Sequence, residues 1–394
     1  MDVRYSAEDE EFRAEVRAWL HDNLAGEFAE AVGTGGPGGE HENVGIRRAW
    51  ERRLGEGRWI GLDWPAAYGG REATLVRQVV FGEEYARAQA PGRVNHMGEN
   101  LLAPTLLAFG TEAQKARFLP PIARGEELWC QGYSEPGAGS DLAALRTRAV
   151  RDEETGDWLI TGQKVWTSLA HEADWIFVLA RTDPDSRRHH GISFLLVPMD
   201  QPGVEVRPIV QLTGTSEFNE VFFDRARAKA EHVVGRPGEG WRVAMGLLAF
   251  ERGVSTLAQQ IGFAQELRTV VDTARENGAI RDPILRDRLL QSWIDLKLLR
   301  CNALRTLGSA DPGAPSVAKL LWATWHQRLG ILAMDVGGAA STLAAAEPYE
   351  LTAAQRLFLF TKADTIYGGS NEVQRNIIAE RVLGLPREPR GDAT

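Results

Sequence analysis

Two short segments of the chain carry residue types suited to binding a flat, polar ring. The first, residues 134–140, reads Ser-Glu-Pro-Gly-Ala-Gly-Ser, and its glycines, Gly139 among them, let backbone amides approach a polar ligand. The second places the indole of Trp166 beside the hydroxyls of Thr167 and Ser168. An indole offers a flat apolar face and a hydroxyl offers one hydrogen-bond donor. This combination suits a planar heteroaromatic ring with a hydrogen-bonding edge nitrogen, and a flavin is such a ring.

Each segment also has an ordinary explanation when taken alone. The loop fits a plain turn, and Trp166 fits a core residue on a strand. The loop is neither a dinucleotide-binding nor a P-loop fingerprint, because residues 145–150, which follow it, are typical of a strand rather than a helix. The specific signal is the order of the two segments, with Trp166 following Ser140 by 26 residues.

Composition limits the class of protein. A chain of 394 residues with 43% apolar content can bury one large core or two to three smaller ones. The net charge of −9 and the scattered basic residues argue against nucleic acid or an anionic membrane as the main partner. Cys130 and Cys301 form no pair or metal-type spacing, so we expect neither a disulfide framework nor a metal site.

The N-terminus is acidic with no apolar stretch behind it, and no run of ~18 apolar residues occurs anywhere in the chain. Secretion and membrane spanning are therefore not expected. With the unpaired cysteines, this pattern predicts a protein of the reducing cytoplasm.

The hydrophobic period changes twice along the chain. Residues 1–127 indicate helices, starting from Ser6 as a helix N-cap with an apolar stripe behind it. Residues 128–236 contain short β-branched and aromatic runs separated by Gly, Pro or Asp clusters, which is typical of a small β-domain. Residues 237–394 return to long helical patterns. The sequence thus predicts an α+β protein of three domains: helical, β and helical bundle.

A glycine-rich run at residues 33–39 resembles a phosphate-binding loop at first sight. No strand pattern precedes it, and no Lys-Ser or Lys-Thr follows it. We therefore expect a mobile surface loop.

Together, the segments Trp-Cys-Gln-Gly-Tyr-Ser-Glu-Pro-Gly-Ala-Gly-Ser-Asp, from Trp129, and Gly-Gln-Lys-Val-Trp-Thr-Ser, ending at Ser168, closely resemble the flavin-binding signatures of the acyl-CoA dehydrogenase family. The resemblance extends over nearly the whole chain. It implies an N-terminal helical domain, a central small β-barrel or sandwich and a C-terminal domain of the four-helix-bundle type. Residues 129–132 and 373–386 are similar to bacterial steroid side-chain acyl-CoA dehydrogenases in particular.

The resemblance implies FAD as cofactor and assigns roles to single residues. Trp166 would stack on the isoalloxazine, Ser168 would hydrogen-bond N5, and Ser140 would contact the cofactor or the substrate's pantetheine. The residues that the resemblance places on the cofactor are Tyr133, Ser134, Gly139, Ser140, Trp166, Ser168, Ser370 and Glu372. The last two would hold the adenosine end.

The reaction that the family catalyses needs a base, because the α C–H of a thioester is a weak acid. None of the eight histidines sits in a suggestive arrangement, whereas a carboxylate in an apolar slot has a raised pKa. Glu251 ends an apolar run. Alone, Glu251 and Arg252 fit a solvated ion pair. The resemblance offers a second place for the base, but that position holds Gly368.

Glu251 is therefore the expected catalytic base, with its backbone amide and a ribityl hydroxyl polarising the thioester. Arg252 and Ser140 are expected to contact substrate. The implied partners are an acyl-CoA or acyl-carrier thioester and an electron-transferring flavoprotein. Residues 274–278, Met334 and Ala228-Lys229 depart from the family's usual cross-subunit motifs and closing Val-Pro. The chain is thus expected in a heterotetramer with a second such chain, or in a homotetramer that holds flavin by other contacts.

Two other functions fit parts of the pattern. A flavin monooxygenase on the same fold, such as an amine N-hydroxylase, would need no carboxylate base, and Glu251 argues against it. A non-catalytic assembly subunit would need neither Glu251 nor the loop at 134–140.

Overall fold

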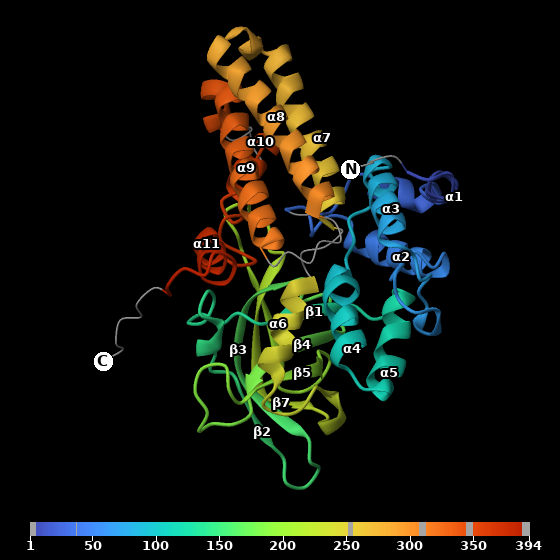
Figure 1. The fold of residues 1–394 in the computed structure, drawn as a ribbon, viewed down its shortest axis with the longest axis vertical. Helices are drawn as coiled ribbons and strands as arrows, with labels where there is room; N and C mark the ends of the chain where they lie inside the picture. Colours follow the sequence, from blue (N-terminus) through green and yellow to red (C-terminus); the bar gives the residue numbers. More distant parts are fainter. Residues whose placement is uncertain (1–4, 37, 251–254, 307–312, 344–349, 388–394) are drawn as a thin grey trace. The chain divides into compact units, whose positions relative to one another are not determined.

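The computed structural model describes residues 5–36, 38–250, 255–306, 313–343 and 350–387. The chain forms two compact units, residues 1–252 and residues 253–394. Figure 1 traces both units in sequence colours from blue to red.

The first unit opens with helices, as the apolar period predicts. The α-helices described here are α1 (Ala7–Asn23), α2 (Val44–Glu56), α3 (Leu75–Arg87), α4 (Ala103–Phe109) and α5 (Glu112–Ala123). The expected cap at Ser6 is confirmed. The Ser6 hydroxyl accepts from the amide of Asp9 at 3.1 Å, and the Asp9 carboxylate accepts from the amide of Ser6, which is a capping box.

A single eight-stranded sheet follows, in the order β6-β7-β3-β2-β4-β5-β8, with β1 also paired to β4. Two strands pair with β4 in parallel: β1 alongside Trp175 to Val178 and β2 at Arg181. The strands are β1 (Trp129–Gly132), β2 (Arg148–Arg151), β3 (Trp158–Ser168), β4 (Trp175–Arg181), β5 (Ile192–Pro198), β6 (Val204–Ile209), β7 (Phe218–Ala228) and β8 (Val233–Val234).

Helix α6 (Gly240–Phe250) returns from the sheet to the helices of the same unit (Figure 1). One core joins α4, α5 and α6 to the sheet; its buried members include Leu106, Phe118, Phe177, Phe194, Val243, Ala244 and Leu247. Gly246 lets α6 approach α4, since a Cβ built there would lie 2.5 Å from the ring of Phe109.

The second unit is helical, and its long helices α7, α8 and α9 pack against one another (Figure 1). Phe263, Leu296, Trp325 and Leu329 are among the buried residues of its core. Its described α-helices are α7 (Ser255–Glu276), α8 (Pro283–Thr306), α9 (Ala314–Gly337), α10 (Ala353–Phe360) and α11 (Asn371–Ile377). No helix in the described ranges has the length and apolar character needed to cross a bilayer.

Candidate flavin-binding site

Trp166 lies on the surface of the sheet, not in its core. Its side chain is 58% exposed and meets the ring of Phe218 edge-on at 6.2 Å. Between Lys164 and Thr167 the register of β3 against β7 shifts, because two residues of β3 face one of β7. Trp166 occupies this bulge with φ +61°, a backbone conformation that bulky residues rarely adopt. The bulge therefore turns an indole outward at the end of β3.

The structure brings the two predicted segments together. The amide of Val165 donates to the carbonyl of Ser134 at 2.9 Å. The Lys164 ammonium donates to the carbonyl of Tyr133 at 3.0 Å and to the carboxylate of Glu135 at 2.9 Å. The loop after β1 is thus held against the end of β3 that carries Trp166.

The Lys164–Glu135 pair is buried, with Lys164 fully inaccessible and Glu135 8% exposed. Burial lowers the pKa of Lys164 to about 8, against the opposing charge of Glu135. Burial also disfavours the Glu135 carboxylate, but Lys164 and the amides of Arg146 and Thr147 outweigh it and lower its pKa. Both groups are therefore ionised near neutral pH, and they fix the loop from beneath.

The loop itself presents backbone to solvent. Gly139 and Ser140 are exposed, and a Cβ built at Gly137 or Gly139 would meet open space. Within the described part of the chain, no acceptor is seen for the amides of Gly139 and Ser140. The side chain of Tyr133 packs edge-on against Phe177 and Phe194, so its main chain is the part that borders the loop.

Ser370 and Glu372 lie in the second unit, at the start of α11. The Ser370 hydroxyl caps the helix by accepting from the amide of Val373 at 3.3 Å, and Glu372 pairs with Arg375 at 3.5 Å on the surface. Gly368 and Gly369, just before them, have φ of +61° and +84°. Glu251 and Arg252 lie outside the described residues. The described part of the chain breaks off at Phe250, the last residue of α6, and resumes at residue 255.

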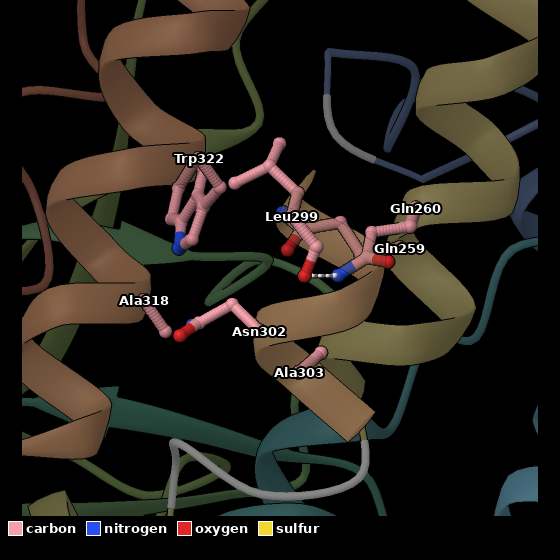
Figure 2. Close-up of a pocket in the computed structure, with 7 residues that line it drawn as sticks. All are labelled: Gln259, Gln260, Leu299, Asn302, Ala303, Ala318 and Trp322. Atoms are coloured by element: carbon pink, nitrogen blue, oxygen red, sulfur yellow. Dashed lines mark hydrogen bonds between the residues drawn. The ribbon is translucent and has the colours of Figure 1, made fainter. Parts of the chain in front are cut away.

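A small cavity lies within the second unit, between α7, α8 and α9 (Figure 2). Its volume of about 10 Å³ is the room of one water molecule. The amide nitrogen of Gln260 donates to the carbonyl of Leu299 at 3.3 Å, and the other lining residues are Gln259, Asn302, Ala303, Ala318 and Trp322. An acyl chain does not fit there, and none of the predicted site residues lines it.

The site in the first unit fits a flat ring with polar edges. An exposed indole offers its face, and neighbouring loop amides offer donors. A helical domain, a β-domain with such a site and a further helical domain define a class of flavin-dependent dehydrogenases.

Comparison with known proteins agrees with this class. Three family models match: the acyl-CoA dehydrogenase N-terminal domain at residues 6–126, the middle domain at 130–226 and the C-terminal domain at 238–383. The chain is 61% identical to acyl-CoA dehydrogenase IpdE1 of Mycobacterium tuberculosis over 386 residues, covering 97% of this chain and 99% of that protein.

Two solved structures are similar over almost the full length. The "Tcur3481-Tcur3483 steroid ACAD" has a TM-score of 0.84 at 32% identity, with 98% of this chain and 100% of that chain covered. The ChsE4-ChsE5 complex from Mycobacterium tuberculosis has a TM-score of 0.80 at 31% identity, with the same coverage. The chain belongs to the acyl-CoA dehydrogenase family, whose three-domain architecture it has and whose members are flavoproteins.

Sequence reasoning missed the Lys164–Glu135 pair. Both residues stand inside the quoted motifs: Glu135 directly follows Ser134, and Lys164 lies two residues before Trp166. Opposite charges in the two motifs, a lysine in one and a glutamate in the other, could have indicated an ion pair between them. It also missed Glu217, which lies beside the bulge and carries no motif of its own.

Proposed function

We propose that the chain catalyses the α,β-dehydrogenation of an acyl-CoA thioester to a trans-2-enoyl thioester, with Glu251 as the base that removes the α-proton. The observation that supports this most strongly is the single site formed by the loop at 134–140 and the outward indole of Trp166. FAD bound there would supply the acceptor for the hydride that leaves the β-carbon.

The chain's own residues then have distinct tasks. Trp166 would support the ring of the cofactor, Ser168 and the amides near Ser134 would bind its edge, and Ser140 would hold the pantetheine. In the sequence Glu251 directly follows α6, an apolar helix whose Val243, Ala244 and Leu247 are buried. An apolar setting raises the pKa of a carboxylate and makes it a usable base.

The second position at which the family carries its base is residue 368, and the residue found there favours Glu251 as the base. Residue 368 is a glycine in a left-handed turn, so that segment carries no carboxylate there. The backbone amide of Glu251 would polarise the thioester carbonyl, and Arg252 would contact the substrate.

We propose that the substrate is a steroid-derived acyl thioester and that the chain assembles with a second acyl-CoA dehydrogenase chain. The two similar structures support this: Tcur3481-Tcur3483 is a steroid ACAD, and it and the ChsE4-ChsE5 complex each carry two chain names. Asn277, inside the departing motif, instead donates to the carbonyl of Val336 at 2.9 Å and closes α7 onto α9. Tetramers saturated with flavin and made from this chain alone would rule the second chain out.

Anaerobic titration of the flavin-loaded protein tests the reaction. A panel of short, long, branched and steroid acyl-CoAs is added without NAD(P)H, and flavin bleaching and the enoyl product are measured. We expect bleaching, strongest with the steroid thioesters. Reduction only by NAD(P)H would instead indicate a monooxygenase.

A further inference from the structure

The end of β3 holds two residues in a conformation that needs outside support. Trp166 and Leu169 both have positive φ, +61° and +52°, and neither is a glycine. Such residues keep this conformation only where the surroundings fix it. They flank Thr167 and Ser168, and Ser168 is the residue expected to hydrogen-bond flavin N5, so whatever holds this turn also sets the direction of the indole.

Glu217 supplies much of that support through its main chain. Its carbonyl accepts from the amide of Leu169 at 2.8 Å and from the side-chain amide of Asn219 at 3.3 Å. Asn219 also donates to the carbonyl of Thr167 at 3.1 Å. The next residue, Phe218, pairs with Ser168 in the ladder and contacts the indole of Trp166.

The side chain of Glu217 is itself fixed from several directions. Its carboxylate is 1% exposed and accepts from Thr215 at 2.7 Å, from the Gln211 amide, and from Nδ1 of His41 at 3.0 Å. Donors from the residues just before Glu217 tie down its own loop. His41 is different, because it comes from the helical domain 176 residues away in sequence.

His41 stands two residues after the glycine-rich run at 33–39, for which the sequence predicted a mobile surface loop. The loop is anchored on Arg47, a fully buried guanidinium that donates to the carbonyls of Glu40 at 2.7 Å, Glu42 at 3.1 Å and Gly92 at 2.7 Å. A Cβ on Gly35 would lie 2.4 Å from that guanidinium, so the close approach of the loop backbone to Arg47 requires glycine at this position. The backbone on both sides of His41 is therefore held in place by Arg47, which fixes the position from which the imidazole reaches Glu217.

From these contacts we propose that His41 is a positioning residue for the flavin site: its hydrogen bond fixes Glu217, which holds the turn that aims Trp166. The chain of contacts runs from the loop at residues 33–42 through Glu217 to the bulge of β3. This rests on the proposed function for its ligand, but the arrangement of the turn is a property of the chain itself.

Substitution of His41 tests the proposal. His41→Phe keeps a ring but has no donor, whereas His41→Asn keeps a donor near the place of Nδ1. His21→Phe is the control, since His21 is an exposed histidine of α1 that contacts its neighbour Asp22. Hydrogen exchange at residues 165–169 of the flavin-free protein, and the dissociation constant for FAD, are the readouts.

We expect His41→Phe to speed exchange in that segment and to weaken FAD binding by about tenfold or more, because a small misplacement in a preorganised site has large effects. His41→Asn should restore both to near the wild-type values, and His21→Phe should change neither. Equal behaviour of the phenylalanine and asparagine variants would overturn the proposal. Should His41→Phe not fold, Glu217→Gln is expected to show the same faster exchange and weaker FAD binding. Wild-type values of both in Glu217→Gln would also overturn the proposal.

The two proposals fail separately. If wild-type protein binds FAD but no acyl-CoA bleaches the flavin, the proposed reaction is wrong. Hydrogen exchange and FAD affinity can still be measured in that case. A reaction that proceeds normally, with unchanged exchange and FAD affinity in His41→Phe, defeats only the positioning role.

Discussion

The left-handed backbone at Trp166 turns an indole toward solvent on a strand that buries Trp158 and Ile160. Exposed apolar rings contribute little to stability, so a fold selected for stability alone has no use for this one. The residue and its conformation together indicate a surface made for a ligand with a flat face.

Trp166→Ala should therefore separate binding from folding. We expect the thermal midpoint to move by no more than a few degrees, since an exposed substitution costs about 1 kcal/mol or less. We expect FAD affinity to fall by about tenfold, the equivalent of ~1.4 kcal/mol lost with the stacked ring. Calorimetry and flavin fluorescence measure the two effects. A large drop in the midpoint with unchanged FAD affinity would show a structural residue instead.

At the scale of elements, the approach of α6 to α4 matters because α6 leads directly to Glu251. Gly246 is the residue that permits this approach, with the ring of Phe109 where a side chain would be. A second helical glycine, Gly262 in α7, has open space at the same position and provides a matched comparison.

Gly246→Ala should destabilise the protein by roughly 1–3 kcal/mol, because the added methyl must displace the ring of Phe109. Gly262→Ala should stabilise it by about 0.5–1 kcal/mol, because alanine favours the helix. Urea denaturation of each variant gives both values. Shifts of the same sign in both variants would contradict the packing argument.

A buried histidine links helices of the second unit and predicts a pH dependence. His326 lies 2.7 Å from both the Asp364 and the Glu266 carboxylates, with the Lys319 ammonium on the Asp364 carbonyl and the Tyr367 hydroxyl on its carboxylate. Burial favours neutral imidazole, but the two carboxylates outweigh it and raise the pKa of His326 from 6.5 to about 9.

The folded pKa is above the unfolded one, so this stabilisation is complete below pH 6.5 and is lost as the pH rises through 9. The shift corresponds to about 3 kcal/mol. Wild-type stability should fall between pH 7 and 10, and His326→Gln should show a flatter profile in the same denaturation series. Parallel profiles for the two proteins would remove His326 from the explanation.

Local signals predicted the elements well and the site only in part. The cap at Ser6, the β-branched and aromatic runs of the sheet and the long helical patterns of the bundle depend on neighbours in sequence, so they can be identified there. The outward direction of Trp166 depends on a register shift against β7, and the Glu217–His41 contact joins residues far apart in the chain. Neither feature produces a periodic pattern of apolar residues in the sequence. The expectation of a core Trp166 was an ordinary alternative that its 58% exposure excludes.

At the scale of the whole molecule, α8 carries an apolar face with no cover among the described residues. Ile284, Leu290, Trp293, Ile294 and Leu298 are 44–69% exposed on this one helix. We propose that these exposed apolar residues form part of the interface with another chain in the proposed assembly.

Trp293→Glu should reduce the assembled mass, because it places a charge among these exposed apolar residues of α8. Thr269→Glu, at an exposed position of α7, is the control and should leave the mass unchanged. Light scattering during gel filtration, with and without the second chain, measures this. An intact assembly in Trp293→Glu would locate the interface elsewhere.

The most direct test of the whole account is the rate of flavin bleaching when Glu251→Gln is mixed anaerobically with a reactive acyl-CoA. Loss of the base should slow bleaching by about 10²–10⁴-fold relative to wild type, with FAD content unchanged. Bleaching at the wild-type rate would contradict the assignment of Glu251 as the group that removes the α-proton.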